Sequence, residues 1–133
     1  MARQAPSAAK NPLPTEAELA ILNILWSRGP STVREVHTAL RERGTGYTTA
    51  LKQMQVMTEK GLLARSERFR SHVYDARVPR ERTQLLLTRN LLERAFDGSA
   101  KNLVLGALSS RPISSSELAE IRAMLDEFEK RIG

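Results

Sequence analysis

The spacing of apolar residues predicts three helices in the first half of the chain. In the first, leucines and a tryptophan recur every three or four positions until a glycine–proline pair ends the segment at 29–30. Thr15 and Glu18 have the spacing of a capping box, in which each side chain accepts a hydrogen bond from the other residue's backbone N–H. Thr32 and Glu35 repeat that spacing, so a second helix is expected to begin there.

The third predicted helix, residues 47–60, divides most clearly into two faces. Ala50, Met54 and Met57 fall on one side at about 100° per residue, which predicts a stripe that faces the core. The opposite side gathers two hydrogen-bonding side chains, a cation and a small apolar patch, namely Thr48, Gln55, Lys52 and Leu51. Two glycines in the preceding turn and Gly61 after the helix define its ends.

After residue 61 the period changes to that of a strand. Apolar residues interleaved with arginines predict a β-hairpin over 62–69 and 71–78, with its tip near 68–72. Arg68 and Arg70 flank Phe69, so on an ideal strand the two arginines share one face. His72 follows at the tip, where it can contact phosphate or remain in solvent.

The remainder of the chain predicts helices over 80–96, over 100–108, and from Ser114 to about 131. Ser114 and Glu117 have the spacing of a third capping box. Apolar residues in the final helix repeat at a 3-4-3-4 spacing: Leu118, Ile121, Leu125, Phe128 and Ile132. Such a stripe must be buried, by packing against Leu91 and Leu103, by pairing with a second chain, or by both.

Three helices followed by a basic hairpin is the order of a winged helix-turn-helix. We therefore expect a mainly α protein with a small β-hairpin wing. The predicted parts are a disordered tail (1–12), a winged-helix DNA-binding domain (13–78) and a helical dimerisation region (79–133).

The charge is unevenly distributed, and this favours a polyanionic partner for the first part. Of the 133 residues, the first 78 hold 12 Lys or Arg against 7 Asp or Glu, whereas the rest hold 9 against 8. Thr48, Lys52 and Gln55 can donate to base edges or phosphates, Leu51 can contact a thymine methyl, and the wing arginines can neutralise phosphates. A winged-helix module that binds RNA or an acidic protein stays open as the alternative.

Composition makes several other functions improbable. The chain has no cysteine and two histidines, so we expect neither a metal site nor a cofactor. It also lacks a nucleophile elbow, a phosphate loop and a metal motif, so an enzyme is not expected. Its longest apolar run, 103–108, is far shorter than a membrane span, and its start does not resemble a signal peptide. The prediction is a cytoplasmic protein without stable membrane association.

The succession of motifs from residue 13 to about 128 resembles the penicillinase repressor family. The segments that carry the resemblance are 13–19, 24–26, 29–36, 46–51, 59–63, 73–74, 96–99 and 118–126. The resemblance implies a dimeric transcriptional repressor that pairs through its C-terminal helices, here through Leu118, Ile121, Leu125 and Phe128. The family's DNA-reading positions match Thr48, Thr49, Leu51, Lys52 and Gln55, and its hairpin tip, here Arg68, Arg70 and His72, contacts the DNA backbone.

The chain departs from the family pattern at three places. The copper-responsive branch has a C-terminal cysteine cluster, which this chain lacks. Leu51 stands where other members carry arginine, so the operator sequence can differ. Family members are also released from DNA when a membrane-bound metalloprotease sensor cleaves the dimerisation region. In the antibiotic-responsive branch that bond joins Asn to Phe, whereas the matching pair here is Gly106–Ala107.

Overall fold

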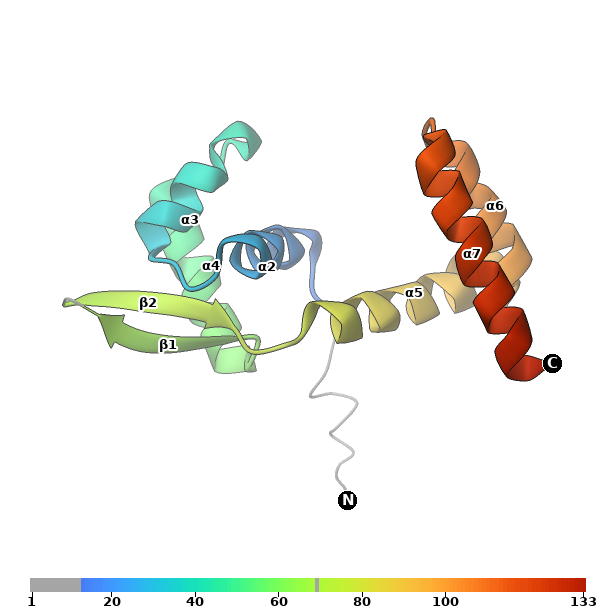
Figure 1. The fold of residues 1–133 in the computed structure, drawn as a ribbon. Coiled ribbons are helices and arrows are strands. Elements are labelled where there is room, and N and C mark those ends of the chain that lie inside the picture. The colour runs from blue at the N-terminus through green and yellow to red at the C-terminus, as the bar shows by residue number, and fades with distance from the viewer. Residues whose placement is uncertain (1–12, 69) are drawn as a thin grey trace, which may run out of the picture. The chain divides into compact units, whose positions relative to one another are not determined.

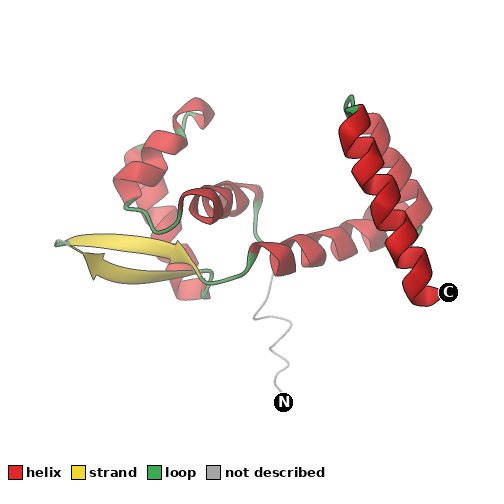
Figure 2. Cartoon of the chain, in the orientation of Figure 1, coloured by secondary structure: helices red, strands yellow, loops and turns green. Residues whose placement is uncertain are grey.

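The computed structural model describes residues 13–68 and 70–133, and its elements follow the predicted order (Figures 1 and 2). These elements are α2 (Glu16–Arg28), α3 (Val33–Ala39), the 3-10 helix η2 (Arg41–Arg43), α4 (Tyr47–Lys60), β1 (Leu63–Arg68), β2 (Ser71–Ala76), α5 (Arg80–Phe96), α6 (Ala100–Ser110) and α7 (Ser115–Ile132). The mainly α fold with one hairpin is thus confirmed. The chain forms two compact units, the first ending at Leu87 and the second covering Thr88–Gly133. The expected tail and Phe69 lie outside the described residues.

Both N-terminal capping boxes form as predicted. The Glu18 N–H donates to Thr15 Oγ1 at 3.1 Å, and the Thr15 N–H donates to Glu18 Oε1 at 3.0 Å. Thr32 and Glu35 make the same reciprocal pair at the start of α3. At α7 the Glu117 N–H donates to Ser114 Oγ, but no return bond to the Ser114 N–H is present among the described contacts.

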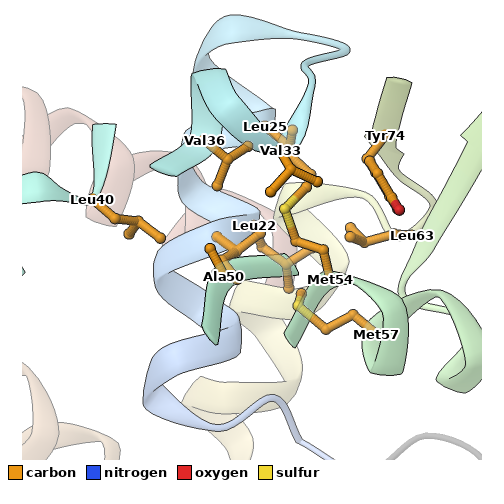
Figure 3. Close-up of a cluster of buried hydrophobic side chains, with 11 residues drawn as sticks. Leu22, Leu25, Val33, Val36, Leu40, Ala50, Met54, Met57, Leu63 and Tyr74 are labelled. Atoms are coloured by element: carbon orange, nitrogen blue, oxygen red, sulfur yellow. The ribbon is translucent and has the colours of Figure 1, made fainter. Parts of the chain in front are cut away.

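The core of the first unit lies where α2, α3 and α4 meet beside the hairpin (Figure 3). Ala50, Met54 and Met57 are fully buried, which confirms the predicted inner face of α4. Leu22 from α2 and Val36 from α3 pack against them, and the core continues into the hairpin through Leu63 and Tyr74. The apolar stripe on α4 therefore fixes which of its side chains face solvent.

The hairpin is a two-stranded antiparallel sheet whose register runs from Leu63 opposite Ala76 to Arg68 opposite Ser71. Arg70 lies in a turn and adopts a left-handed backbone with φ of 65°. The expectation that Arg68 and Arg70 share a strand face is therefore wrong, because Arg70 belongs to the turn.

The second unit contrasts with the first in its burial. From Thr88 to Gly133, all of which the structure describes, no residue is buried. α6 runs two residues beyond its predicted end, to Ser110, and stops where Arg111 becomes extended before Pro112. Among the helices of the described residues, none has the length and apolar character needed to cross a membrane.

Candidate nucleic-acid interface

α4 exposes four of the five residues that the sequence predicted to read DNA. Thr48, Thr49, Lys52 and Gln55 are exposed on this helix. Leu51 differs, because it is half-buried and packs against the edge of the core. The exposed residues supply hydroxyls, an amide and an ammonium group, the donors and acceptors that read base edges and phosphates.

A groove runs along the side of α4 that faces α2. It is lined by Thr15, Glu18, Thr48, Thr49, Lys52, Gln53, Val56 and Lys60. Three of the predicted reading residues, Thr48, Thr49 and Lys52, therefore share one wall of this groove. The capped first turn of α2 forms the other wall.

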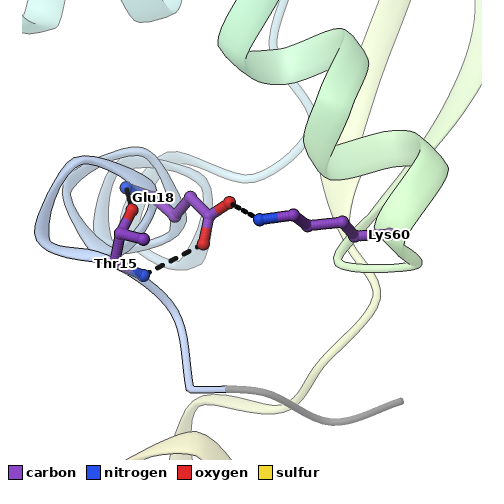
Figure 4. A network of polar contacts seen from close by, with 3 residues as sticks. All are labelled: Thr15, Glu18 and Lys60. Carbon is purple, nitrogen blue, oxygen red and sulfur yellow. Dashed lines mark hydrogen bonds and ion pairs between the residues drawn. The ribbon is translucent and has the colours of Figure 1, made fainter. Parts of the chain in front are cut away.

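A buried carboxylate ties α2 to the end of α4 beside this groove (Figure 4). Glu18 is 2% exposed, and its Oε2 accepts from Lys60 Nζ at 2.7 Å. Burial raises the pKa of Glu18, but this is outweighed by the Lys60 hydrogen bond and charge and by hydrogen bonds from Thr15, which together hold the pKa below its ordinary value. The carboxylate therefore stabilises the fold above about pH 4.3, its ordinary range, and that contribution is lost as the pH falls through the lowered pKa.

Replacing Lys60 with Met is expected to lower the free energy of unfolding by about 1–3 kcal/mol at neutral pH, because Glu18 loses its cationic partner while it stays buried. The pKa of Glu18 should rise in the variant, so its carboxyl becomes protonated at a higher pH. Urea unfolding between pH 4 and 7 measures both effects. Lys130→Met is the matched control, since Lys130 Nζ pairs with Glu127 Oε2 at 3.8 Å and both side chains are exposed. Equal stability of the two variants would contradict this role for the buried pair.

A second groove separates the start of α4 from α3 and the wing. Its lining contains no carboxylate and consists of Thr32, Val33, Arg34, Tyr47, Leu51, Ser71, His72 and Tyr74. The Tyr47 ring meets the half-buried His37 ring edge-on, with centroids 5.7 Å apart, which holds the tyrosine in place. Arg34, Tyr47 and His72 thus surround a strip of surface that can accept a phosphate group.

The face of the wing toward α4 is set by the strand register. Arg65 and Glu67 lie opposite Tyr74 and His72, on the same face as the buried Leu63. Arg65 lines a further groove with Gln55, Thr58, Glu59 and Tyr74. Arg65 is therefore a wing cation that lies beside α4.

The structure brings His72 beside α4 but places the two predicted wing arginines elsewhere on the wing. Arg68 alternates with Glu67 and so points to the opposite face of the sheet from Arg65, and Arg70 lies in the turn. Sequence reasoning missed two donors of the groove walls, Arg34 and Tyr47. The helical phase of α3, in which Val33 and Val36 face the core, could have indicated that Arg34 is exposed. Arg65 is among the predicted wing arginines, but its place beside α4 depends on where the turn lies.

The remaining predicted residues lie in the second unit. In α7, Leu118 and Ile121 are half-buried, whereas Leu125 and Phe128 are exposed. Gly106 and Ala107 fall within α6, where Gly106 is half-buried and Ala107 is exposed. Among residues 13–68 and 70–133, no three His, Asp or Glu side chains gather as a metal ion would require.

The family model described as penicillinase repressor matches residues 14–127. The chain belongs to the penicillinase repressor family. It is 24% identical to the penicillinase repressor of Bacillus licheniformis over 123 residues, which cover 92% of this chain and 96% of that one. It is 18% identical to the penicillinase repressor of Staphylococcus aureus over 116 residues, covering 86% and 92% of the two chains.

Membership of the penicillinase repressor family makes the chain a DNA-binding transcriptional repressor rather than an enzyme. The match extends through both compact units, so the helices from α5 onward are part of the family's fold.

Proposed function

We propose that this protein represses transcription as a homodimer that binds an inverted-repeat operator through the exposed face of α4. The observation that carries the proposal is the division of α4 into a fully buried apolar side and an exposed side of donors and acceptors. Flanking grooves supply further cations on both sides of the helix. A major groove admits a helix of this kind.

In this proposal the exposed residues of α4 divide the work of reading DNA. Gln55 and Lys52 bond base edges, an amide favouring adenine and an ammonium favouring guanine. Thr48 and Thr49 contact bases or phosphates near the start of the helix. Leu51, half-buried beside Tyr47, offers its exposed part to a thymine methyl.

Phosphate contacts are proposed to come from the surfaces around α4. The wing contributes Arg68 and Arg70 at its tip and His72 beside α4. Arg34 and Arg65 line the two grooves that separate α4 from the wing. These contacts fix the position of the protein on the duplex but carry no sequence information themselves.

Dimerisation is proposed to occur through the second unit. The exposed apolar side chains of this unit include Val104 and Leu105 on α6 and Met124, Leu125, Phe128 and Ile132 on α7. An exposed apolar surface of this extent, in helices with no buried residue, needs a partner to cover it. A second copy fits because residues 79–133 carry a net charge of only +1, so two copies do not repel strongly.

For release from DNA, we propose that a membrane-bound metalloprotease sensor cleaves between Gly106 and Ala107. Both residues lie inside α6, so the helix must unwind locally before a protease can bind the backbone. Gly106 favours unwinding, because glycine costs about 1 kcal/mol relative to alanine within a helix. Mass spectrometry after incubation with membranes that carry the sensor should find a fragment ending at Gly106, and an intact chain would contradict this route.

The experiment that tests DNA binding is a titration of duplex DNA from upstream of the protein's own gene at two salt concentrations. A repressor that neutralises several phosphates gives specific binding whose log affinity falls steeply with log salt. A slope near zero, or equal affinity for any duplex, contradicts operator recognition. Tighter binding to RNA would favour a winged-helix module with another partner.

Replacing Gln55 with Ala is expected to relax discrimination at one or two operator positions, because a bidentate contact to a base contributes about 1–3 kcal/mol of selectivity. Competition between the operator and its single-base variants measures this selectivity. Asn23→Ala, which removes an exposed amide from α2, serves as the control. If the Gln55 variant keeps the parent's sequence preference, this face of α4 does not read the bases.

A further inference from the structure

The start of α5 is fastened to the end of α2 by contacts within the first unit. Trp26 Nε1 donates a hydrogen bond to the Val78 carbonyl at 2.9 Å. The Arg80 guanidinium lies over the Trp26 ring, 5.9 Å from its centroid, and its Nη2 donates to Ser27 Oγ at 3.4 Å. The first hydrogen bond holds the segment directly before α5, and the cation–π contact and the second hydrogen bond join α5 to α2, more than 50 residues away in the sequence.

The backbone around this junction is held as well. Val78 packs against the edge of the core, and Pro79 restricts the backbone directly before the helix. Thr83, one turn into α5, is buried and donates from Oγ1 to the Pro79 carbonyl at 3.1 Å. The first two turns of α5 thus belong to the same compact unit as α4.

α5 is also the segment through which the chain passes from the first unit to the second. It is one continuous helix from Arg80 to Phe96, and the boundary between the units falls after Leu87. The part of α5 in the first unit therefore begins at a segment that Trp26 and Arg80 hold against α2. Neither residue lines the grooves that flank α4.

We propose that Trp26 and Arg80 are positioning residues that determine which spacing between operator half-sites the dimer accepts. The inference rests on the proposed function, since it requires a dimer with one α4 in each half-site. Each added base pair moves one half-site by about 3.4 Å and rotates it by about 35°, so a stiff exit of α5 matches few spacings. If the start of α5 is held less firmly, each α4 can reach its half-site at more spacings, and the dimer becomes less selective for spacing.

The test begins with the wild-type protein and a library of random duplexes. Selection recovers the bound half-site and its preferred spacing. A series of duplexes then carries this half-site as an inverted repeat, with the spacer changed in steps of one base pair. The measured quantity is the ratio of affinities between the best spacer and spacers one or two base pairs longer or shorter.

Arg80→Met removes the cation and its hydrogen bond but leaves the Trp26 ring in place, and Trp26→Phe removes the indole N–H but keeps an aromatic ring. Each variant is expected to lower the spacing ratio about 3- to 10-fold, the equivalent of one hydrogen bond or cation–π contact. Affinity for a duplex with a single half-site should stay within about twofold of wild type, because the reading face is unchanged. Arg82→Met, an exposed arginine in the same turn of α5, is the control that should keep the wild-type ratio.

The proposal is overturned if Arg80→Met keeps the wild-type ratio of affinities between spacers. It is also overturned if this variant loses affinity equally at every spacer, because in both cases the contacts of Arg80 only support the fold. Arg80→Met carries the test alone if Trp26→Phe does not fold. If wild-type protein enriches no half-site at all, the proposed function fails instead, and the two failures are distinguishable.

Discussion

Replacing Leu125 with Asp is expected to convert the protein to a monomer and to weaken operator binding at least about tenfold, since a buried unpaired carboxylate costs several kcal/mol. Leu125 is 56% exposed in the single chain and lies in the middle of the apolar stripe of α7. In a dimer that stripe becomes a seam, and a charge placed in it has no partner. The first unit should remain folded, because its core draws on residues of that unit alone and Leu125 lies in the second.

Sedimentation measures the oligomeric state of this variant, and titration of operator DNA measures its affinity. Ala123→Asp is the matched control, because position 123 lies two residues from Leu125 and therefore on the other side of α7. If Leu125→Asp stays dimeric with intact affinity, the dimer forms elsewhere and the stripe packs within one chain.

Replacing both Arg68 and Arg70 with Ala is expected to weaken specific and non-specific DNA binding alike, and to flatten the slope of log affinity against log salt by about 2. The two side chains leave the wing from different positions, one from β1 and one from the turn, so each is expected to meet its own phosphate. Near physiological salt the loss of two contacts amounts to at least about tenfold in affinity.

The salt dependence of binding to operator and to random duplex measures this effect. The control is a double variant, Arg111→Ala and Arg122→Ala, which removes the same amount of charge from exposed positions of the second unit. If the slope of log affinity against log salt is unchanged in the wing variant, the wing tip does not contact the DNA. A slope that falls by the same amount in the control would show that net charge, rather than the wing, decides binding.

Much of the first unit could be predicted because local rules agree with its packing. The capping residues Thr15 and Thr32 fix two helix starts through short-range hydrogen bonds. Gly61, with φ of 88°, ends α4 at the predicted residue. The 3.6-residue period then placed Met54 and Met57 in the core and Lys52 in solvent.

What could not be predicted depends on contacts between distant segments. The side of the wing that faces α4 follows from the pairing of Arg65 with Tyr74, which depends on a turn without an Asn-Gly or Asp-Gly signal. The burial of Leu51 comes from the edge of the core beside it, which its helical phase did not indicate. The junction of Trp26 with Val78 and Arg80 spans more than 50 residues, so no local pattern could have indicated it.

A hydroxyl-radical footprint of the wild-type protein on DNA from upstream of its own gene shows directly whether one α4 enters each half-site of an operator. A homodimer that inserts one α4 into each half-site predicts two protected segments related by two-fold symmetry. Their centres should lie about 34 Å apart, or a multiple of that distance. A single protected segment would contradict the dimeric arrangement. Uniform protection that appears only at concentrations that coat any duplex would contradict sequence-specific repression itself.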